Sequence, residues 1–286
     1  MNAAATAREE RILEDIQRPI TQRTRGRAHG PVVRLVSPSD IGESIKPFVF
    51  LDRFEVDPSN APMFGMHPHS GIATLTFLLE GELAYEDTIG GQGVLPAGGV
   101  EWMRASGGAW HTGRMTGTAR GRGLQLWVAM PPRFENAQPH AQYIAPNEVP
   151  RVGPARVLLG RYGGAFSPIA APGSATYLYV ELKKGQRWTF TPTPGHTVAW
   201  AYAFDGVVHA SGEPLEKTLA VFAECDAPID FIAETDAGFA VASAVKHPYP
   251  LVLGYYSVHT SAQALAEGEA RIARIGEQLR AEGRIG

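Results

Sequence analysis

The 286-residue sequence has a single cysteine, Cys225, and therefore cannot form an internal disulfide bond. It has no run of 18 apolar residues, and its first segment, MNAAATAREERILEDIQ, carries charges where a signal peptide needs an apolar run. The net charge is only −3, which argues against general attraction to nucleic acid or to an anionic membrane. These absences predict a cytoplasmic protein with no nucleic-acid partner and no membrane partner.

Short β-strands dominate what the sequence does contain. Glycine (32 residues) and proline (22 residues) are scattered between apolar segments, and 44% of the residues are hydrophobic, which is enough for a well-buried core. The strand-like segments are rich in β-branched and aromatic residues. They include VVRLV, PFVFLDRF, TLTFLL, GLQLWVAM, TYLYVEL, TVAWAYAF and FAVASAV. The pattern predicts an all-β fold.

Only the C-terminal segment has a helical pattern, in which Ser261 can cap the first turn. Apolar residues recur on one helical face at Leu265, Ile272, Ile275 and Leu279. Gly268 and Gly276 weaken this helix, so we expect it to pack against a partner surface.

A faint internal repeat indicates two domains of one plan. FLLEGELAYEDTIGG (77–91) and AYAFDGVVHASGEPL (201–215) both read as an apolar strand, an acid, a glycine, a second strand and a turn. The repeat predicts two barrels, which shelter the strand edges. We expect the first in residues 1–140, with residues 1–28 as a solvated arm, and the second with the terminal helix in residues 141–286. The boundary would then lie inside the proline-rich segment Pro131–Pro154.

The segment MHPHSG (66–71) contains the most informative polar pattern. In a strand, His67 and His69 point to the same face about 6–7 Å apart, while Pro68 points away and stiffens the backbone. A third histidine, His111, follows in SGGAWHTGRM. Three imidazoles would suit Fe, Cu, Ni or Zn. Alternatively, the first two are histidines at a strand start that bond to loop carbonyls.

The block HPHSGIATLTFLLEGELAYEDTIGGQGVLPAGGVEWMRASGGAWHTGRM, followed by GLQLWVAMPP, resembles the pirin family of the cupin superfamily. PFVFLDRF and HPYPLVLGYYSVHTS also resemble pirin segments, and the likeness covers about residues 25–260. The resemblance implies two stacked cupin (double-stranded β-helix) barrels with a C-terminal helix. It also implies one metal ion in the N-terminal barrel, held by His67, His69 and His111.

Two positions depart from the pirin pattern. The fourth pirin ligand is a glutamate two residues after the third histidine, and here that residue is Gly113. The acid that pirins carry after HPH is replaced by Ala73. The site could hold a metal with three histidines and waters, or it could be empty. Glu101 is a candidate substitute ligand because its strand leads to His111, although we expect a surface or core-edge position for this residue.

The resemblance implies a metal-dependent dioxygenase that acts on flavonol-type, quercetin-like substrates. In that chemistry a carboxylate ligand doubles as the base; Gly113 cannot take a proton, so no catalytic residue is assigned. The expected cofactor is one divalent ion, with Fe ahead of Zn, Ni, Cu or Mn. The alternative is a non-enzymatic regulatory or binding protein with a weakened or empty site. The partner would be a small aromatic substrate in the first case and a protein in the second.

The other histidines have no partner at ligand spacing. His196 lies where the repeat would place the histidine pair of the second barrel, but it stands alone, so we expect no second metal site. Five more lie in loops or at strand ends, namely His29, His140, His209, His247 and His259. Trp110, next to His111, is a candidate pocket wall.

Overall fold

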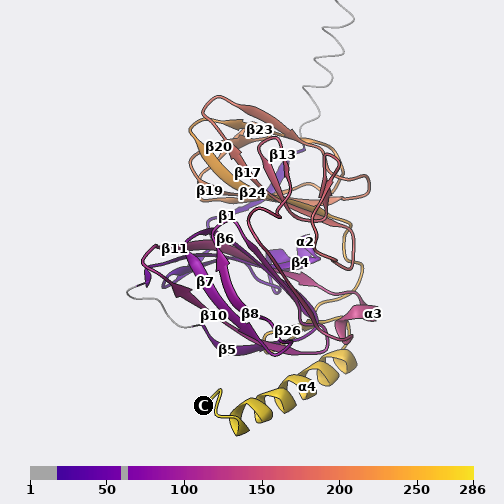
Figure 1. The fold of residues 1–286 in the computed structure, drawn as a ribbon. Coiled ribbons are helices and arrows are strands. Elements are labelled where there is room, and N and C mark those ends of the chain that lie inside the picture. Colours follow the sequence, from indigo (N-terminus) through magenta and orange to yellow (C-terminus); the bar gives the residue numbers. More distant parts are fainter. Residues whose placement is uncertain (1–17, 59–63) are drawn as a thin grey trace, which may run out of the picture.

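The computed structural model describes residues 18–58 and 64–286, and it has two β-barrels stacked on one another (Figure 1). The all-β prediction is confirmed, as is the C-terminal helix. All pairings between neighbouring strands are antiparallel. Among the described residues, no helix combines the length and the apolar character that crossing a membrane requires.

The N-terminal barrel consists of two sheets. The seven-stranded sheet has the order β12 (His140–Ile144), β9 (Val100–Arg104), β6 (Ile72–Glu80), β11 (Gly121–Ala129), β4 (Phe48–Val56), β3 (Val32–Val36) and β2 (Arg27–His29). The four-stranded sheet has the order β5 (Phe64–His69), β10 (Ala109–Thr116), β7 (Glu82–Asp87) and β8 (Gln92–Pro96). Buried side chains from both sheets meet in one cluster that includes Phe54, Leu78, Leu83 and Met115, so the sheets enclose a common interior.

The C-terminal barrel repeats this plan. Its seven-stranded sheet has the order β1 (Ile20–Thr24), β22 (Leu219–Phe222), β19 (Val198–Asp205), β24 (Ala237–Ala244), β17 (Ala175–Leu182), β14 (Ala155–Leu159) and β13 (Arg151–Val152). Its four-stranded sheet has the order β18 (Arg187–Phe190), β23 (Ile229–Ala233), β20 (Val208–Ala210) and β21 (Glu213–Leu215). The repeat glycines, Gly81 and Gly206, occupy corresponding turns, after β6 and after β19, and both have the left-handed φ that glycine tolerates (+88° and +69°).

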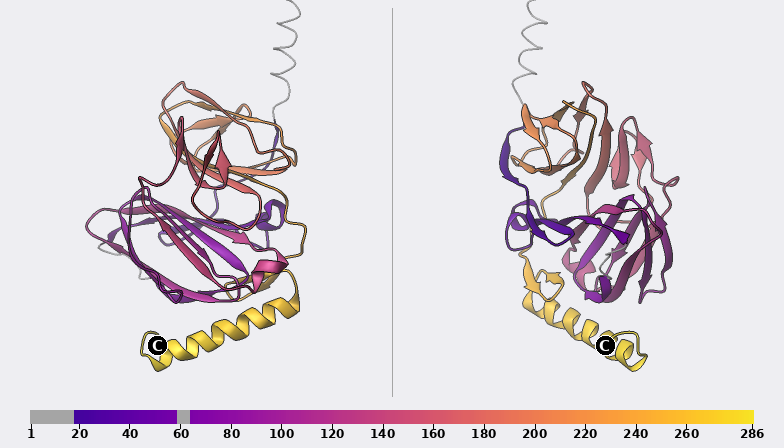
Figure 2. Two further views of the ribbon diagram at one scale, coloured as in Figure 1. Left: turned by 45° about the vertical axis from the view of Figure 1, so that its right-hand side comes forward. Right: turned by 90° about the vertical axis from the view of Figure 1, so that its left-hand side faces the viewer.

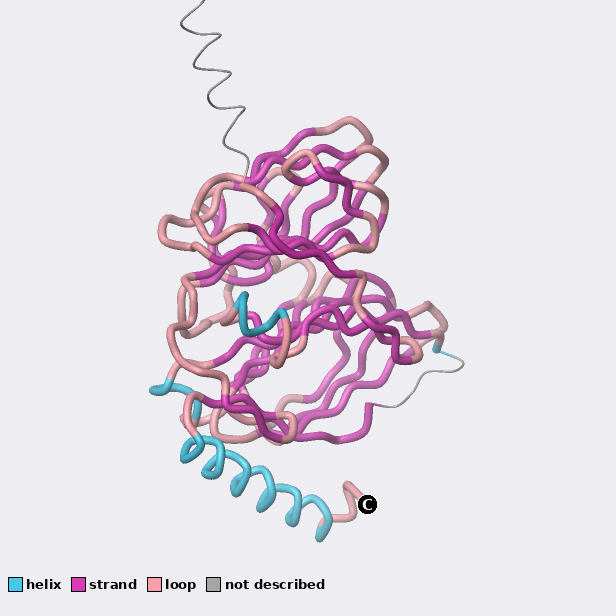
Figure 3. The backbone as a smooth tube through the Cα atoms, turned by 180° about the vertical axis from the view of Figure 1, so that it is seen from behind, coloured by secondary structure: helices cyan, strands magenta, loops and turns pink. Residues whose placement is uncertain are grey.

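The largest core cluster joins the two seven-stranded sheets. It contains Phe77 and Trp102 from the first barrel together with Tyr177 and Trp200 from the second. One face of each sheet therefore lines a barrel interior, and the other face packs against the neighbouring barrel. This explains why β24 is buried at every position and reads as a continuous small and apolar run. The short helix α2 (Ile41–Ile45) lies between the barrels, which the reverse view shows (Figure 3).

Two strands belong to a different barrel from the one that the predicted domain bounds give them. β1 lies within the expected arm of residues 1–28, yet it pairs with β22 at the edge of the C-terminal sheet. The Arg18 guanidinium also donates to the carbonyls of Ala223 (2.7 Å) and Thr197 (2.5 Å). β12 starts at His140 but pairs with β9 of the first barrel. We therefore propose a boundary between residues 144 and 151, still within the proline-rich segment; residues 1–17 lie outside the described part of the chain.

Helix α4 (Ala262–Ala281) lies across the outer side of the N-terminal barrel (Figure 2). Ser261 caps it by accepting a hydrogen bond from the Ala264 N–H. The helix glycines stand where other groups approach: a Cβ on Gly276 would lie 2.8 Å from the Trp110 ring, and one on Gly268 would lie 2.6 Å from His259. The expected partner surface is thus the barrel that carries the candidate site. The remaining elements are α3 (Pro132–Glu135), the pair β15 (Arg161–Tyr162) and β16 (Ala165–Phe166), and the hairpin of β25 (Val252–Gly254) and β26 (Ser257–His259).

Candidate metal centre

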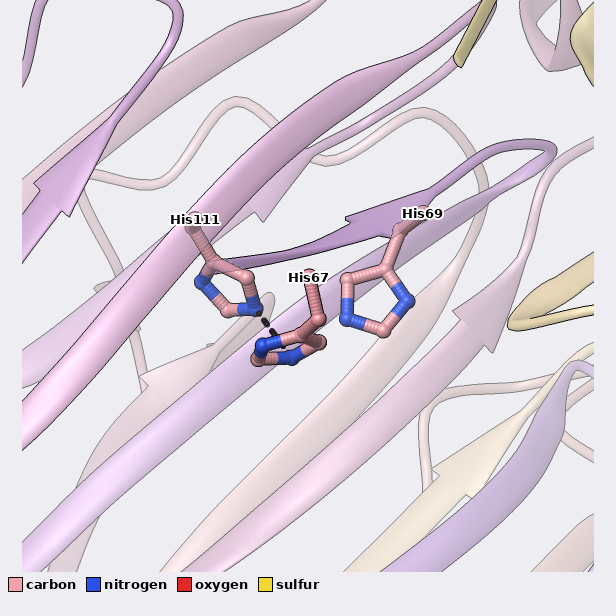
Figure 4. Close-up of side chains that lie close together, drawn as sticks. All are labelled: His67, His69 and His111. Atoms are coloured by element: carbon pink, nitrogen blue, oxygen red, sulfur yellow. Dashed lines mark hydrogen bonds between the residues drawn. The ribbon is translucent and has the colours of Figure 1, made fainter. Parts of the chain in front are cut away.

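Two neighbouring strands bring the three predicted histidines together. His67 and His69 lie on β5, and His111 on β10 stands directly opposite His67 in the antiparallel register. One ring nitrogen from each histidine lies within 4.8 Å of the others. Among the described residues, no other group of three or more His, Cys, Asp or Glu side chains is arranged so that it could hold a metal ion. Figure 4 shows the three rings turned toward one another. Alternation along β5 and direct pairing with β10 together produce this convergence.

In each ring, the nitrogen that points away from the other two histidines (Nδ1, the outer nitrogen) lies within hydrogen-bonding distance of an oxygen atom. His67 Nδ1 lies 2.8 Å from the carbonyl of Gly65, His69 Nδ1 lies 3.1 Å from the carbonyl of Tyr256, and His111 Nδ1 lies 3.2 Å from Oε1 of Glu101. Because carbonyl and carboxylate oxygens only accept, each Nδ1 carries the proton and donates it. Each Nε2 is therefore left as a lone-pair donor, which is the form a metal ligand needs.

The Nε2 atoms, which point toward the shared centre and are called the inner nitrogens, are suited to bind a cation. His67 Nε2 and His111 Nε2 lie 3.1 Å apart, so two lone pairs face each other once both Nδ1 atoms carry protons. His69 Nε2 is buried and has no hydrogen-bond partner among the described residues. A buried ring nitrogen without a partner is costly unless another group occupies it. The residues therefore suit a divalent transition-metal ion with a preference for imidazole.

Glu101 is buried next to His111, which differs from the position expected from the sequence. The expected surface or core-edge position is wrong, because β9 lies inside the seven-stranded sheet and Glu101 is only 3% exposed. Its carboxylate bonds to the outer nitrogen of His111 and not to the shared centre. This is the arrangement in which a carboxylate fixes the orientation of a metal-binding histidine. An acid in the otherwise apolar strand VEWM was the only signal for it in the sequence.

Gly113 lies on the wall of a small cavity at the centre. The cavity volume is about 70 Å³, and His67, His111 and Glu101 line the same space. A Cβ on Gly113 would lie 3.2 Å from Leu83 Cδ1, and the residue is not among those with positive φ. A Cβ at this position would therefore need only a small displacement of Leu83. Ala73 belongs instead to the core between the barrels.

The structure also places two other residues that the sequence singled out, Trp110 and His196. Trp110 is not a pocket wall: alternation along β10 turns it away from His111, and its indole N–H donates to the Ile272 carbonyl of α4 (2.9 Å). In the second barrel His196 is buried between the hydroxyls of Ser174 (2.7 Å) and Ser243 (3.0 Å). No second metal-type cluster occurs in the part of the chain that the structure describes.

Burial keeps His67 and His69 neutral. Desolvation, reinforced by the nearby His111, lowers the pKa of His67 to about 4. Desolvation also holds the pKa of His69 well below its ordinary value of 6.5. Protons therefore compete weakly for the inner nitrogens at neutral pH, which favours metal binding.

The lowered pKa values predict acid sensitivity of the metal-free protein. Above pH 6.5 both folded and unfolded His67 are neutral; between pH 6.5 and 4 only the unfolded form takes up a proton, so stability falls as the pH drops through this window. Each such histidine adds a slope of up to about 1.4 kcal/mol per pH unit. Urea unfolding with chelator present should show a smaller loss between pH 7 and 5 in His67→Gln than in the wild type. Equal losses in both proteins would contradict the expectation.

Comparison with known proteins places these observations in context. Residues 31–128 match the family model described as Pirin. A pirin-like protein of Caulobacter vibrioides is 30% identical over 240 residues, which cover 77% of this chain and 84% of the relative. A provisionally assigned quercetin 2,3-dioxygenase of Pseudomonas aeruginosa is 29% identical over 243 residues (79% and 84%). Among eight curated relatives the matched part spans from 49% to 84% of the relative's own length.

Solved structures show the same fold. A quercetin 2,3-dioxygenase from Acinetobacter baumannii superimposes with a TM-score of 0.82 at 24% identity and covers 90% of this chain and 97% of its own. A bacterial pirin from Escherichia coli in complex with nickel(II) superimposes with a TM-score of 0.63 at 18% identity (80% and 96%). At these identities the likeness establishes the arrangement of the two barrels.

Proposed function

The chain belongs to the pirin family, and on that premise we propose that it binds one divalent metal ion through His67, His69 and His111. We further propose that the loaded protein is a dioxygenase for flavonol-type substrates. The main support for the metal site is the common orientation of three imidazoles, each with Nδ1 hydrogen-bonded to an oxygen and Nε2 turned toward the shared centre. The names of its relatives support the reaction class.

The residues of the site have separable roles in this proposal. His67, His69 and His111 would hold the ion, and Glu101 would keep His111 in the required tautomer. The bound ion would supply Lewis-acid polarisation of the substrate's hydroxyl-ketone edge. Iron remains the expected metal, and the nickel(II) complex of a bacterial pirin from Escherichia coli supports nickel as an alternative. Zn, Cu and Mn also stay in the prediction.

A binding or regulatory role is the second candidate, and the cavity favours it. The space at the centre is about 70 Å³, whereas pockets for drug-sized ligands are about 300–1,000 Å³. A three-ring flavonol would need side chains such as Leu83 and Met115 to move aside. Gly113 offers no base either. A weakened or empty centre with a protein partner therefore remains the alternative to catalysis.

Metal analysis and oxygen uptake of the wild-type protein test the proposal. Protein purified without a polyhistidine tag should bind one equivalent of Fe(II) or Ni(II) per chain in anaerobic titrations. Quercetin should then cause oxygen uptake in the metal-loaded sample and none after chelation, beyond the background of free metal. A folded, loaded protein without oxygen uptake would favour the regulatory alternative. Failure to bind any of the five metals would exclude the metal site itself.

A further inference from the structure

The C-terminal hairpin of β25 and β26 reaches the candidate metal centre from far along the chain. It lies beside the N-terminal barrel next to α4 (Figure 1) and outside the segment that matches the family model. Its two-residue turn consists of Tyr255 and Tyr256. The carbonyl of Tyr256 accepts the hydrogen bond from His69 Nδ1, so one histidine of the cluster depends on this turn for its tautomer.

The backbone of Tyr256 is unusual. Its φ is +56°, in the left-handed region that glycine and asparagine tolerate and that costs other residues energy. Its ring centroid lies 5.8 Å from that of His67 and 5.9 Å from that of His69, so the side chain packs beside the cluster. Backbone strain of this kind persists only where the surrounding structure holds the residue in place.

A buried polar network holds the turn against the histidine strand. Ser70, which follows His69, donates through Oγ to Ser257 Oγ (2.9 Å), and the same hydroxyl lies 3.0 Å from His259 Nε2. The backbone joins the same residues, because the Val258 N–H donates to the Ser70 carbonyl (3.2 Å). The side chains of Ser70, Ser257 and His259 are at most 2% exposed.

The network continues to α3. The Glu135 carboxylate lies 3.4 Å from His259 Nδ1 and accepts from the backbone N–H (2.6 Å) and the hydroxyl (2.7 Å) of Thr260. The sequence placed His259 in a loop or at a strand end, with no partner at ligand spacing. The sequence could not indicate this contact, because Ser70 and His259 are 189 residues apart.

We propose that Tyr256 is a positioning residue of the metal centre. Its left-handed turn, held by Ser70, Ser257 and His259, aims the carbonyl at His69 Nδ1 and so directs His69 Nε2 to the shared centre. The C-terminal hairpin thereby supports a site whose three ligands lie on β5 and β10. The inference rests on the proposed metal-binding function, but its structural half concerns the metal-free protein and can be tested without any ion.

Two substitutions of Tyr256 distinguish the effect of its carbonyl orientation from the effect of its ring. Tyr256→Gly removes the ring but keeps the left-handed turn, whereas Tyr256→Pro removes the ring and forces φ to about −65°. We expect Ni(II) affinity within about threefold of wild type for the glycine variant and a loss of about 10–100-fold for the proline variant. Tyr256→Val, which disfavours positive φ but keeps the N–H, replaces proline if that variant does not fold.

Nitrogen-15 NMR of the histidine rings in chelator-treated protein provides the second measurement. His69 should carry its proton on Nδ1 in the wild type and in Tyr256→Gly, and should lose that single tautomer in the proline or valine variant. Equal Ni(II) affinity and equal His69 tautomers in the folded variants would overturn the inference. If the wild type binds no Ni(II), the proposed metal site fails, and the His69 tautomer alone still decides whether Tyr256 positions the ring.

Discussion

Gly113→Glu is expected to tighten metal binding and to raise flavonol oxidation by about 10²–10⁴-fold, the range of a well-placed general base. Gly113 lies on the wall of the cavity that His67 and His111 also line. A glutamate there would add an anionic ligand to three neutral imidazoles and would supply the missing proton acceptor. The measurements are a metal titration and a quercetin oxygen-uptake assay on both proteins.

The local geometry allows this substitution. Gly113 is not among the residues with positive φ, so an L-residue is not strained there. The nearest obstacle to the added Cβ is Leu83 Cδ1 at 3.2 Å, so the first carbon of the side chain requires Leu83 to move by only a few tenths of an ångström. The rest of the glutamate would extend into the cavity that Gly113 lines. Folding is checked by circular dichroism before either measurement is interpreted.

Gly113→Gln and Gly113→Ala are the matched controls for the carboxylate. Glutamine has nearly the same shape as glutamate but no charge and no basic oxygen, and alanine reports the effect of the Cβ alone. We expect both to bind metal more weakly than Gly113→Glu and to show no gain in oxygen uptake. If folded Gly113→Glu binds no better and turns over no faster than the wild type, Gly113 is not the vacated ligand position.

His111→Ala is expected to abolish stoichiometric metal binding, because it removes one of three inner nitrogens. Glu101→Gln should give a smaller loss of about 10–100-fold, typical of removing the carboxylate that orients a ligand. The glutamine still fits the buried space and can accept from His111 Nδ1, but it lacks the negative charge. Titration of both variants with Ni(II), monitored by calorimetry, measures the two losses.

The order of these two losses is the informative result. His209→Ala is a suitable control, since His209 lies in the second barrel and pairs with Glu234 (2.8 Å) away from the cluster. It should leave the affinity unchanged. A larger loss for Glu101→Gln than for His111→Ala would mean that Glu101 is itself the ligand and would reverse the assignment of the two roles.

The sequence by itself determined the features that depend on neighbouring residues. Alternation along a strand placed His67 and His69 on one face, and the Ser261 cap with apolar residues at helical spacing determined the C-terminal helix. The strand pattern also determined the all-β class. These predictions required only local rules of geometry. The internal repeat predicted two barrels, and the resemblance to pirins identified them as cupin barrels and assigned His111 as the third ligand.

Tertiary structure alone decided the surroundings of the site. The acceptor for His69 is the carbonyl of Tyr256, 187 residues away, and any residue type carries a carbonyl, so no side-chain pattern announces it. Glu101 is only ten residues from His111, but the intervening SGGA loop hides the register between their strands. The pairing of β1 with the distant β22 is likewise not visible in the sequence. Strand pairing across long separations is set by burial and backbone hydrogen bonding in the assembled sheets, which the order of residues does not display.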